Sequence, residues 1–201
     1  MELRGLAVSW NEDQQWEKSW WNGCTNTLSE ELKQLSYFKR LGLVETPPGS
    51  VKTRFVFDMH GKSVLDIGGG PCSFLLKCVN VKGIIVDPCD YPRWICERYR
   101  ESGIDYWWCC KGEAITGLRC DEVWIYNVLQ HVEDPQKIIQ NALKAGKTLR
   151  LFDWINAGVH PGHPHNLTAE QLDSWIGGKG TVEQINENDA VGECYYIIKE
   201  T

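Results

Sequence analysis

The chain has 201 residues, enough for one buried core and too few for two ordinary catalytic domains. Its net charge is −6, from 27 acidic and 21 basic residues, and no run of Lys or Arg forms a strip for phosphates, so long nucleic acid is disfavoured as a partner. No stretch approaches the roughly 20 apolar residues of a membrane span, and residues 1–4 lack the apolar core of a signal peptide. We therefore expect a soluble, cytoplasmic protein without a membrane partner.

The cysteines number nine, and no two of them are spaced as C-x-x-C. Several lie in apolar runs, where a small hydrophobic side chain suits a core. We expect reduced thiols, with neither a disulfide framework nor a cysteine metal site.

Residues 1–49 predict a tryptophan-rich helical cap that belongs to the same domain as residues 50–201. Capping-box patterns at residues 9–12 and 27–30 indicate where two helices begin. The two helices are expected at residues 10–21 and 28–41.

The rest of the chain alternates apolar runs with turn residues and helix caps. Strands are expected in the apolar run that begins at residue 63 and breaks into glycines, and at residues 83–86, 104–110, 122–128, 147–154, 181–185 and 193–199. Helices are expected at residues 74–79, 91–100, 134–145 and 168–176. Asp134 is the expected N-cap of the third of these helices, and Thr168 with Gln171 forms a capping box at the fourth. This alternation predicts an α/β fold with a doubly wound sheet.

The segment after the first of these strands runs from a carboxylate, Asp66, into three glycines, Gly68, Gly69 and Gly70. Glycine permits positive φ and close approach of a ligand to the backbone. About twenty residues later a second apolar run ends in Asp87, a spacing that suits a β-α-β unit whose second strand carries an acid for a ribose. A dinucleotide site requires a third glycine where Ser73 stands, which weakens a nicotinamide reading but leaves it open.

This order of residues resembles the cofactor site of class I S-adenosylmethionine-dependent methyltransferases. The resemblance covers roughly residues 50–201 and implies a Rossmann-like sheet of seven strands with the last strand antiparallel. It also implies S-adenosylmethionine as the cofactor. The glycine loop would pass under its methionine part, Asp87 would bind both ribose hydroxyls, and Asp66 would support the loop and the aminoacyl end.

Two later segments extend the resemblance. Glu113 follows the third strand of the core, where the family places an acid near the adenine amino group. Residues 121–135 resemble the family's broad small-molecule group, so Asn127 and Leu129 would line the methionine side and His131 would face the pocket. The Asn/Asp-Pro-Pro-aromatic motif is missing, which argues against a nucleobase-amino or glutamine methyltransferase.

Few catalytic side chains are required, because the sulfonium is already a strong electrophile and the protein mainly aligns the acceptor. A base is needed only for an acceptor that arrives protonated, and His131 is the first candidate, with Asp153 at the end of the fifth strand as the second.

Two groups of side chains are candidates for the acceptor side. The histidines follow the fifth strand and are interpreted as a substrate loop in preference to a metal site, so no metal is expected; they are His160, His163 and His165. The tryptophans of the cap would either close over the acceptor or pack the cap onto the sheet, and both readings stay open; they are Trp16, Trp20 and Trp21.

The sequence thus predicts an S-adenosylmethionine-dependent methyltransferase that acts on oxygen or nitrogen of a small molecule. One alternative keeps the fold with a macromolecular acceptor, RNA or protein. Another is a cofactor-binding subunit without catalysis that regulates or scaffolds a partner.

Overall fold

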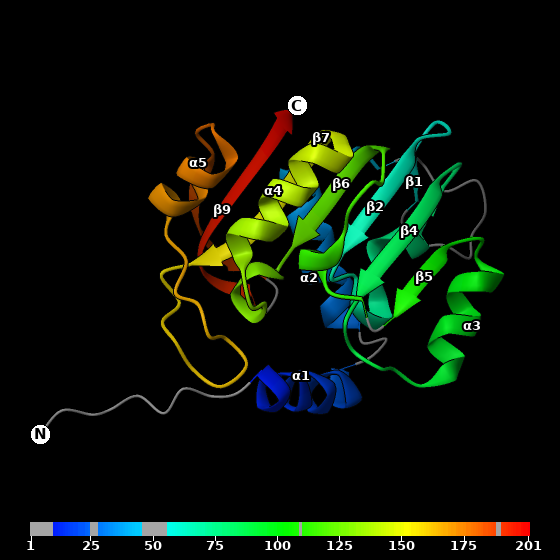
Figure 1. Cartoon of the computed structure of the whole chain (residues 1–201), viewed down its shortest axis with the longest axis horizontal. Coiled ribbons are helices and arrows are strands. Elements are labelled where there is room, and N and C mark those ends of the chain that lie inside the picture. Colours follow the sequence, from blue (N-terminus) through cyan, green and yellow to red (C-terminus); the bar gives the residue numbers. More distant parts are fainter. Residues whose placement is uncertain (1–9, 25–27, 46–55, 109, 188–189) are drawn as a thin grey trace, which may run out of the picture.

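The computed structural model describes residues 10–24, 28–45, 56–108, 110–187 and 190–201, and its centre is a sheet of seven strands (Figure 1). The strand order across the sheet is β5-β4-β2-β6-β7-β9-β8. In chain order the strands are β2 (Ser63–Ile67), β4 (Lys82–Asp87), β5 (Asp105–Trp108), β6 (Cys120–Tyr126), β7 (Gly146–Ile155), β8 (Thr181–Glu187) and β9 (Ala190–Glu200).

The first five strands pair in parallel, whereas β9 is antiparallel to both β7 and β8. A chain that closes its sheet with a hairpin must reverse direction there, and β8 and β9 are separated only by residues 188–189. The predicted fold class, with seven strands and an antiparallel last strand, is confirmed.

Helices cover both faces of the sheet. They are α1 (Trp10–Cys24), α2 (Leu28–Arg40), α3 (Arg93–Glu101), α4 (Pro135–Ala145) and α5 (Ala169–Ile176). The predicted caps of the last two are confirmed: Asp134 accepts from the Lys137 N–H at 3.0 Å, and Thr168 and Gln171 form the capping box. The capping boxes predicted at residues 9–12 and 27–30 involve positions outside the described residues.

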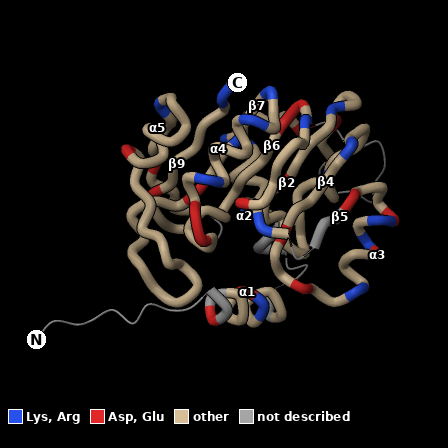
Figure 2. The backbone as a smooth tube through the Cα atoms, viewed as in Figure 1, with Lys and Arg blue, Asp and Glu red and all other residues tan. Residues whose placement is uncertain are grey.

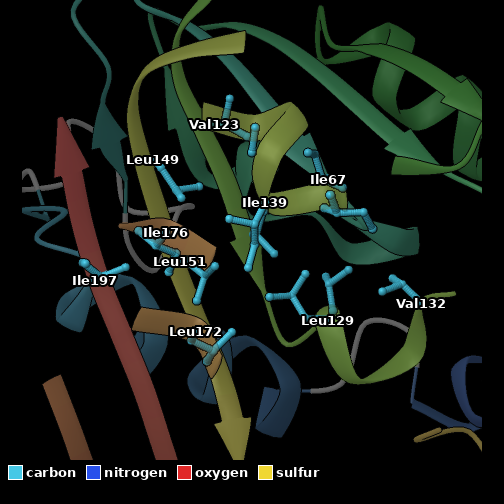
Figure 3. Packing of buried hydrophobic residues seen from close by; sticks show 14 of the residues in the cluster. Ile67, Val123, Leu129, Val132, Ile139, Leu149, Leu151, Leu172, Ile176 and Ile197 are labelled. Carbon is cyan, nitrogen blue, oxygen red and sulfur yellow. The ribbon is translucent and has the colours of Figure 1, made fainter. Parts of the chain in front are cut away.

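The alternation of side chains along β6 divides the core into two clusters. Trp124 and Tyr126 point to one face, where α2 adds Phe38, which stacks on Phe74 with ring centroids 3.9 Å apart. Val123 and Ile125 point to the other face, which α4 and α5 cover (Figure 3). Because α2 is buried in a sheet-facing cluster, it is packed as core.

The predicted helix at residues 74–79 is wrong. The glycine loop continues into two short 3₁₀ turns, η1 (Gly70–Cys72) and η2 (Phe74–Lys77), and then into a strand, β3 (Cys78–Val79). β3 pairs in parallel with β1 (Phe57–Asp58) in a separate two-stranded sheet. The helix expected between β2 and β4 is therefore replaced by 3₁₀ turns and a short strand.

α1 lies across the carboxyl ends of the parallel strands, beneath the arrowheads of β2, β4 and β6 in the view of Figure 1. Loops at that edge of a doubly wound sheet are the usual place for a ligand. Within the described residues, no helix is long and apolar enough to cross a membrane. Lys and Arg alternate with Asp and Glu around the described part of the molecule (Figure 2).

Candidate active site

The glycine loop after β2 adopts a backbone that other residues would resist. Gly68 has φ +75°, and a Cβ there would lie 2.6 Å from the Val128 Cγ2 atom. At Gly69 a Cβ would lie 2.5 Å from Oδ2 of Asp66. Gly70 has φ +56°, again a region that L side chains rarely adopt. The loop is thus held close against its neighbours and offers bare backbone to the space above β2.

Asp66 supports the loop from below. Its side chain is fully buried, and its Oδ2 accepts hydrogen bonds from the Ser73 hydroxyl at 2.5 Å and the Tyr126 hydroxyl at 2.8 Å. Its Oδ1 has no hydrogen-bond partner among the described residues. Burial raises the pKa of Asp66 to about 7, since a charged carboxylate is poorly solvated there.

The raised pKa values predict how stability depends on pH. Burial raises the pKa of Asp87 to about 7 and that of Asp153 to about 6, as it does for Asp66. A carboxyl with a raised folded pKa stabilises the fold fully below its unfolded value and loses that contribution as pH rises through the folded value. The unfolding temperature of the cofactor-free protein should therefore decrease as the pH rises from about 4 to about 7.

Asp66→Asn tests this pH dependence, because an amide oxygen can accept from Ser73 and Tyr126 but cannot ionise. We expect thermal unfolding followed from pH 4 to pH 7 to show a shallower decline in the variant than in the wild type. A wild-type unfolding temperature that is constant or rises over that range contradicts the prediction.

Side-chain hydroxyls occupy the backbone N–H groups beyond the glycines. The N–H of Ser73 donates to the Tyr99 hydroxyl at 2.8 Å, and that of Phe74 donates to the Tyr126 hydroxyl at 3.1 Å. The N–H of Leu75 donates to Oγ of Ser73 at 3.1 Å. A pyrophosphate needs such groups unpaired at a helix start, so this loop lacks the anion site of a dinucleotide fold.

Asp87 ends β4 directly beside the glycine loop. Its Oδ2 accepts from the Gly70 N–H at 3.0 Å and its Oδ1 from the Cys89 N–H at 2.8 Å, with the side chain buried. Each carboxylate oxygen has further acceptor capacity, so this carboxylate can also receive two hydroxyls of a bound ribose. The second strand thus ends in a buried acid beside the glycine loop, and ribose binding by this acid stays a prediction.

Two residues predicted to contact the cofactor are placed away from the space above the loop. Glu113 Oε1 accepts from the Glu133 and Asp134 N–H groups, both at 3.1 Å, and so holds the start of α4. Leu129 is fully buried in the apolar cluster under α4 (Figure 3). The placement of both residues leaves their predicted cofactor contacts without support.

Asp153 is likewise a buried acceptor of backbone N–H groups. Its Oδ2 accepts from Val128 and Leu129 at 3.1 and 2.7 Å, and its Oδ1 accepts from Trp154 at 2.9 Å. It is fully buried and does not line the cavity described next. Its position suits holding the loop after β6, and it does not support the predicted catalytic role.

A cavity of about 710 Å³ opens beside the glycine loop. It is bounded by α1 and α2 on one side and by the ends of β6, β7 and the β8–β9 hairpin on the other. The predicted site residues among its lining are Gly68, Gly69, Asn127, His131, Trp16, Trp20, Trp21, His160 and His163. Further lining residues include Glu17, Lys33, Tyr37, Gln130, Trp154, Asn156 and Glu193.

Two tryptophans of α1 cover the two loops that frame this cavity. The Trp21 ring lies over Gly70, where a Cβ would be 3.5 Å from its Cζ2 atom. The Trp16 ring is packed against Gly162, which has φ +83° and where a Cβ would be 2.4 Å from its Cε3 atom. α1 therefore contacts both the glycine loop and the histidine loop.

Glu17 joins these contacts and was missed in the sequence. Its Oε1 accepts from Nε1 of Trp21 at 2.7 Å, and its Oε2 lies 3.5 Å from Nδ1 of His131. Glu17 is four residues before Trp21 and so shares its helix face, the one sequence signal that could have identified it.

His131 has a defined tautomer in this arrangement. Its Nδ1 lies 2.6 Å from the Gly162 carbonyl oxygen, which can only accept, so Nδ1 carries the proton. Its Nε2 is therefore the acceptor nitrogen, 3.4 Å from Nε2 of Gln130, whose amide also donates to Asn127 Oδ1 at 2.9 Å. An imidazole nitrogen with a lone pair at the cavity can receive a proton.

The structure separates the three histidines of the loop after β7. His160 and His163 line the cavity, with ring centroids 4.0 Å apart, and exchange two backbone hydrogen bonds. His165 lies outside the lining, with Nε2 2.7 Å from the Val132 carbonyl oxygen. The described residues contain no group of three His, Cys, Asp or Glu side chains arranged to hold a metal ion.

The strand order, with β9 antiparallel between β7 and β8, together with the glycine loop and the acid ending β4, defines the fold of class I S-adenosylmethionine-dependent methyltransferases. The 1,6-didemethyltoxoflavin-N1-methyltransferase of Burkholderia thailandensis is similar to the chain with a TM-score of 0.61 and 14% sequence identity, over 98% of this chain and 91% of that one. That protein was crystallised with S-adenosylhomocysteine and 1,6-didemethyltoxoflavin.

A Thermotoga maritima S-adenosylmethionine-dependent methyltransferase, described as a possible histamine N-methyltransferase, has a TM-score of 0.59 and 15% identity over 96% of this chain and 92% of that one. The N-methyltransferase NodS of Bradyrhizobium japonicum, with bound S-adenosylhomocysteine, has a TM-score of 0.56 and 16% identity over 87% and 88% of the two chains. No protein-family model and no curated protein matches the sequence. At these identities the likeness establishes the fold.

Proposed function

We propose that the protein is an S-adenosylmethionine-dependent methyltransferase whose acceptor is oxygen or nitrogen of a small molecule. The observation that carries the proposal is the position of the cavity. It begins at Gly68 and Gly69, next to the carboxylate of Asp87, and is bordered by the tryptophans of α1. A cofactor held on the loop would thus face a partly open cavity of the size of a small-molecule site.

The residues present fit this cofactor. Asp87 would hold the ribose, and the bare backbone of the glycine loop, supported by Asp66, would lie against the methionine part. Asn127, which has φ +56° and lines the cavity, would contact the same part. When bound, the cofactor supplies an electrophilic methyl group.

The chain itself then has three tasks. The aromatic walls from α1 exclude water, the cavity orients the acceptor, and Nε2 of His131 receives the acceptor's proton. His131 is held for that task by Gly162 on one ring nitrogen, while Asp153 holds the backbone two residues before it.

The nicotinamide alternative lacks support, because Tyr99 and Tyr126 occupy the N–H groups that a pyrophosphate requires. The macromolecular alternative gains nothing from the charge distribution, in which basic and acidic residues are interspersed (Figure 2). The cavity beside the loop favours catalysis over the regulatory alternative.

The test is formation of S-adenosylhomocysteine, measured by mass spectrometry, when purified protein and S-adenosylmethionine are mixed with a panel of small aromatic amines and phenols. We expect at least one acceptor to gain a methyl group in step with product formation. Tight binding of the cofactor with no turnover on any member would favour the regulatory alternative, and no binding at all would refute the cofactor assignment.

A further inference from the structure

We propose that the acceptor is a basic amine on a flat, apolar body, and that Glu193 selects its ammonium end. This inference rests on the proposed function and assigns the acceptor class that the fold leaves open. Its basis is the combination of aromatic walls with two glutamates and a single lysine among the described residues that line the cavity.

The walls of the cavity are aromatic on both sides. α1 supplies Trp16 and Trp20, α2 supplies Tyr37, and β7 supplies Trp154. Aromatic faces attract flat apolar bodies and, through their quadrupole, cations. One cation–π contact is already present in the cavity wall: the Lys33 ammonium lies 5.0 Å from the centroid of the Trp20 ring. An ammonium group is thus a suitable occupant of this wall.

The carboxylates of the lining have different surroundings. Both carboxylate oxygens of Glu17 already have protein partners: Oε1 accepts from Trp21, and Oε2 lies near His131. Glu193, the fourth residue of β9, is half-buried, and its Oε2 accepts from Asn156 Nδ2 at 2.7 Å. Its Oε1 makes no hydrogen bond to any described residue. Glu193 is therefore the carboxylate available to a ligand cation.

Positive charge in the lining does not compensate for these carboxylates. Of the described residues around the cavity, Lys33 is the single Lys or Arg. Burial, followed by the neighbouring His131 and His160, lowers the pKa of His163 to about 3, so that ring is neutral at physiological pH. A phenolate or carboxylate acceptor would meet two glutamates, whereas an ammonium ion would meet complementary charge.

An amine acceptor also gives His131 a purpose. The ammonium must lose a proton before its nitrogen has an electron pair, and Nε2 of His131 is the acceptor nitrogen at the cavity. The nitrogen pair then forms the bond to the methyl carbon while the carbon–sulfur pair remains on sulfur. Glu17, 3.5 Å from Nδ1, offsets the charge of the resulting imidazolium.

The test compares probes that share a body and differ at one end: 2-phenylethylamine, 2-phenylethanol and 3-phenylpropionate, with the corresponding indolyl and naphthyl sets. Binding is measured by calorimetry at neutral pH with S-adenosylhomocysteine saturating, which prevents turnover. We expect at least one amine to bind about tenfold more tightly than its alcohol, since a charge-assisted contact adds roughly 1.5 kcal/mol or more. The carboxylate should bind more weakly than either.

Glu193→Gln should reduce that preference to less than about threefold and leave the affinity for S-adenosylhomocysteine unchanged. Glu200→Gln, at the other end of β9, is the matched control and should keep the preference. The proposal is overturned if no amine exceeds its alcohol, or if Glu193→Gln keeps the full preference. Loss of S-adenosylhomocysteine binding in the wild type is a separate result, which would refute the proposed function itself.

Discussion

Asp87→Asn should weaken binding of both S-adenosylmethionine and S-adenosylhomocysteine by about 30- to 100-fold. The carboxylate would accept two ribose hydroxyls, and hydrogen bonds to a charged group contribute about 1.5–3 kcal/mol. The amide keeps the shape of the side chain but has one acceptor oxygen for the N–H groups of Gly70 and Cys89 together. Calorimetric titration gives both affinities.

The control for this variant is Asp90→Asn, three residues along and exposed. It should leave both affinities within about twofold, because a solvated carboxylate outside the site contributes little. Thermal unfolding of each variant separates a loss of affinity from a loss of fold. Unchanged affinities in Asp87→Asn would show that Asp87 does not bind the ribose, and would contradict the cofactor assignment.

His131→Asn should lower kcat by about 10²- to 10⁴-fold, the usual contribution of a positioned general base. The asparagine amide can still donate to the Gly162 carbonyl oxygen, as Nδ1 of the imidazole does, so the loop contact is retained. What disappears is the acceptor nitrogen at the cavity. Cofactor affinity should change by less than about threefold, since His131 is placed on the acceptor side.

His165→Asn is the matched variant, because His165 also bonds a backbone carbonyl but lies outside the cavity lining. Steady-state kinetics on the acceptor found in the panel should give a kcat within about threefold of the wild type for this control. Equal rates for the wild type and His131→Asn would mean that the acceptor arrives unprotonated or uses another base.

Much of the fold was accessible from the sequence because local signals and burial agree there. The caps at Asp134 and Thr168 mark where α4 and α5 begin, and both side chains make the expected hydrogen bonds. β6 contains the apolar run of residues 123–126, and such a run in an alternating chain becomes an inner parallel strand.

The helix predicted at residues 74–79 failed because tertiary contacts override local preference there. Tyr99 from α3 and Tyr126 from β6 bind the N–H groups of Ser73 and Phe74, and β3 then pairs with β1. No sequence signal near residues 74–79 indicates these partners, because Tyr99 and Tyr126 lie far along the chain.

The candidate site divides in the same way. The glycines and Asp87 are next to one another in space because the ends of adjacent parallel strands meet at one edge of the sheet, as their spacing indicates. Glu113 and Leu129 follow strands and Asp153 lies near the end of β7, but their side chains turn to a helix start, the apolar core and a loop backbone. A position after a strand does not determine the direction of its side chain.

The acceptor side was the least predictable part. Glu193 lies on the closing hairpin and Glu17 on α1, and they reach the same cavity only through the way the cap and the hairpin fold over the sheet edge. The division of the chain into residues 1–49 and 50–201 stays a prediction, as its boundary lies outside the described residues.

A crystal structure of the protein with S-adenosylhomocysteine tests the central claim most directly. We predict that the ribose hydroxyls lie within hydrogen-bonding distance of Asp87, that the methionine part follows the glycine loop, and that the sulfur faces the cavity between Trp21 and His131. A cofactor found elsewhere, or bound with its sulfur turned away from that cavity, would contradict the account.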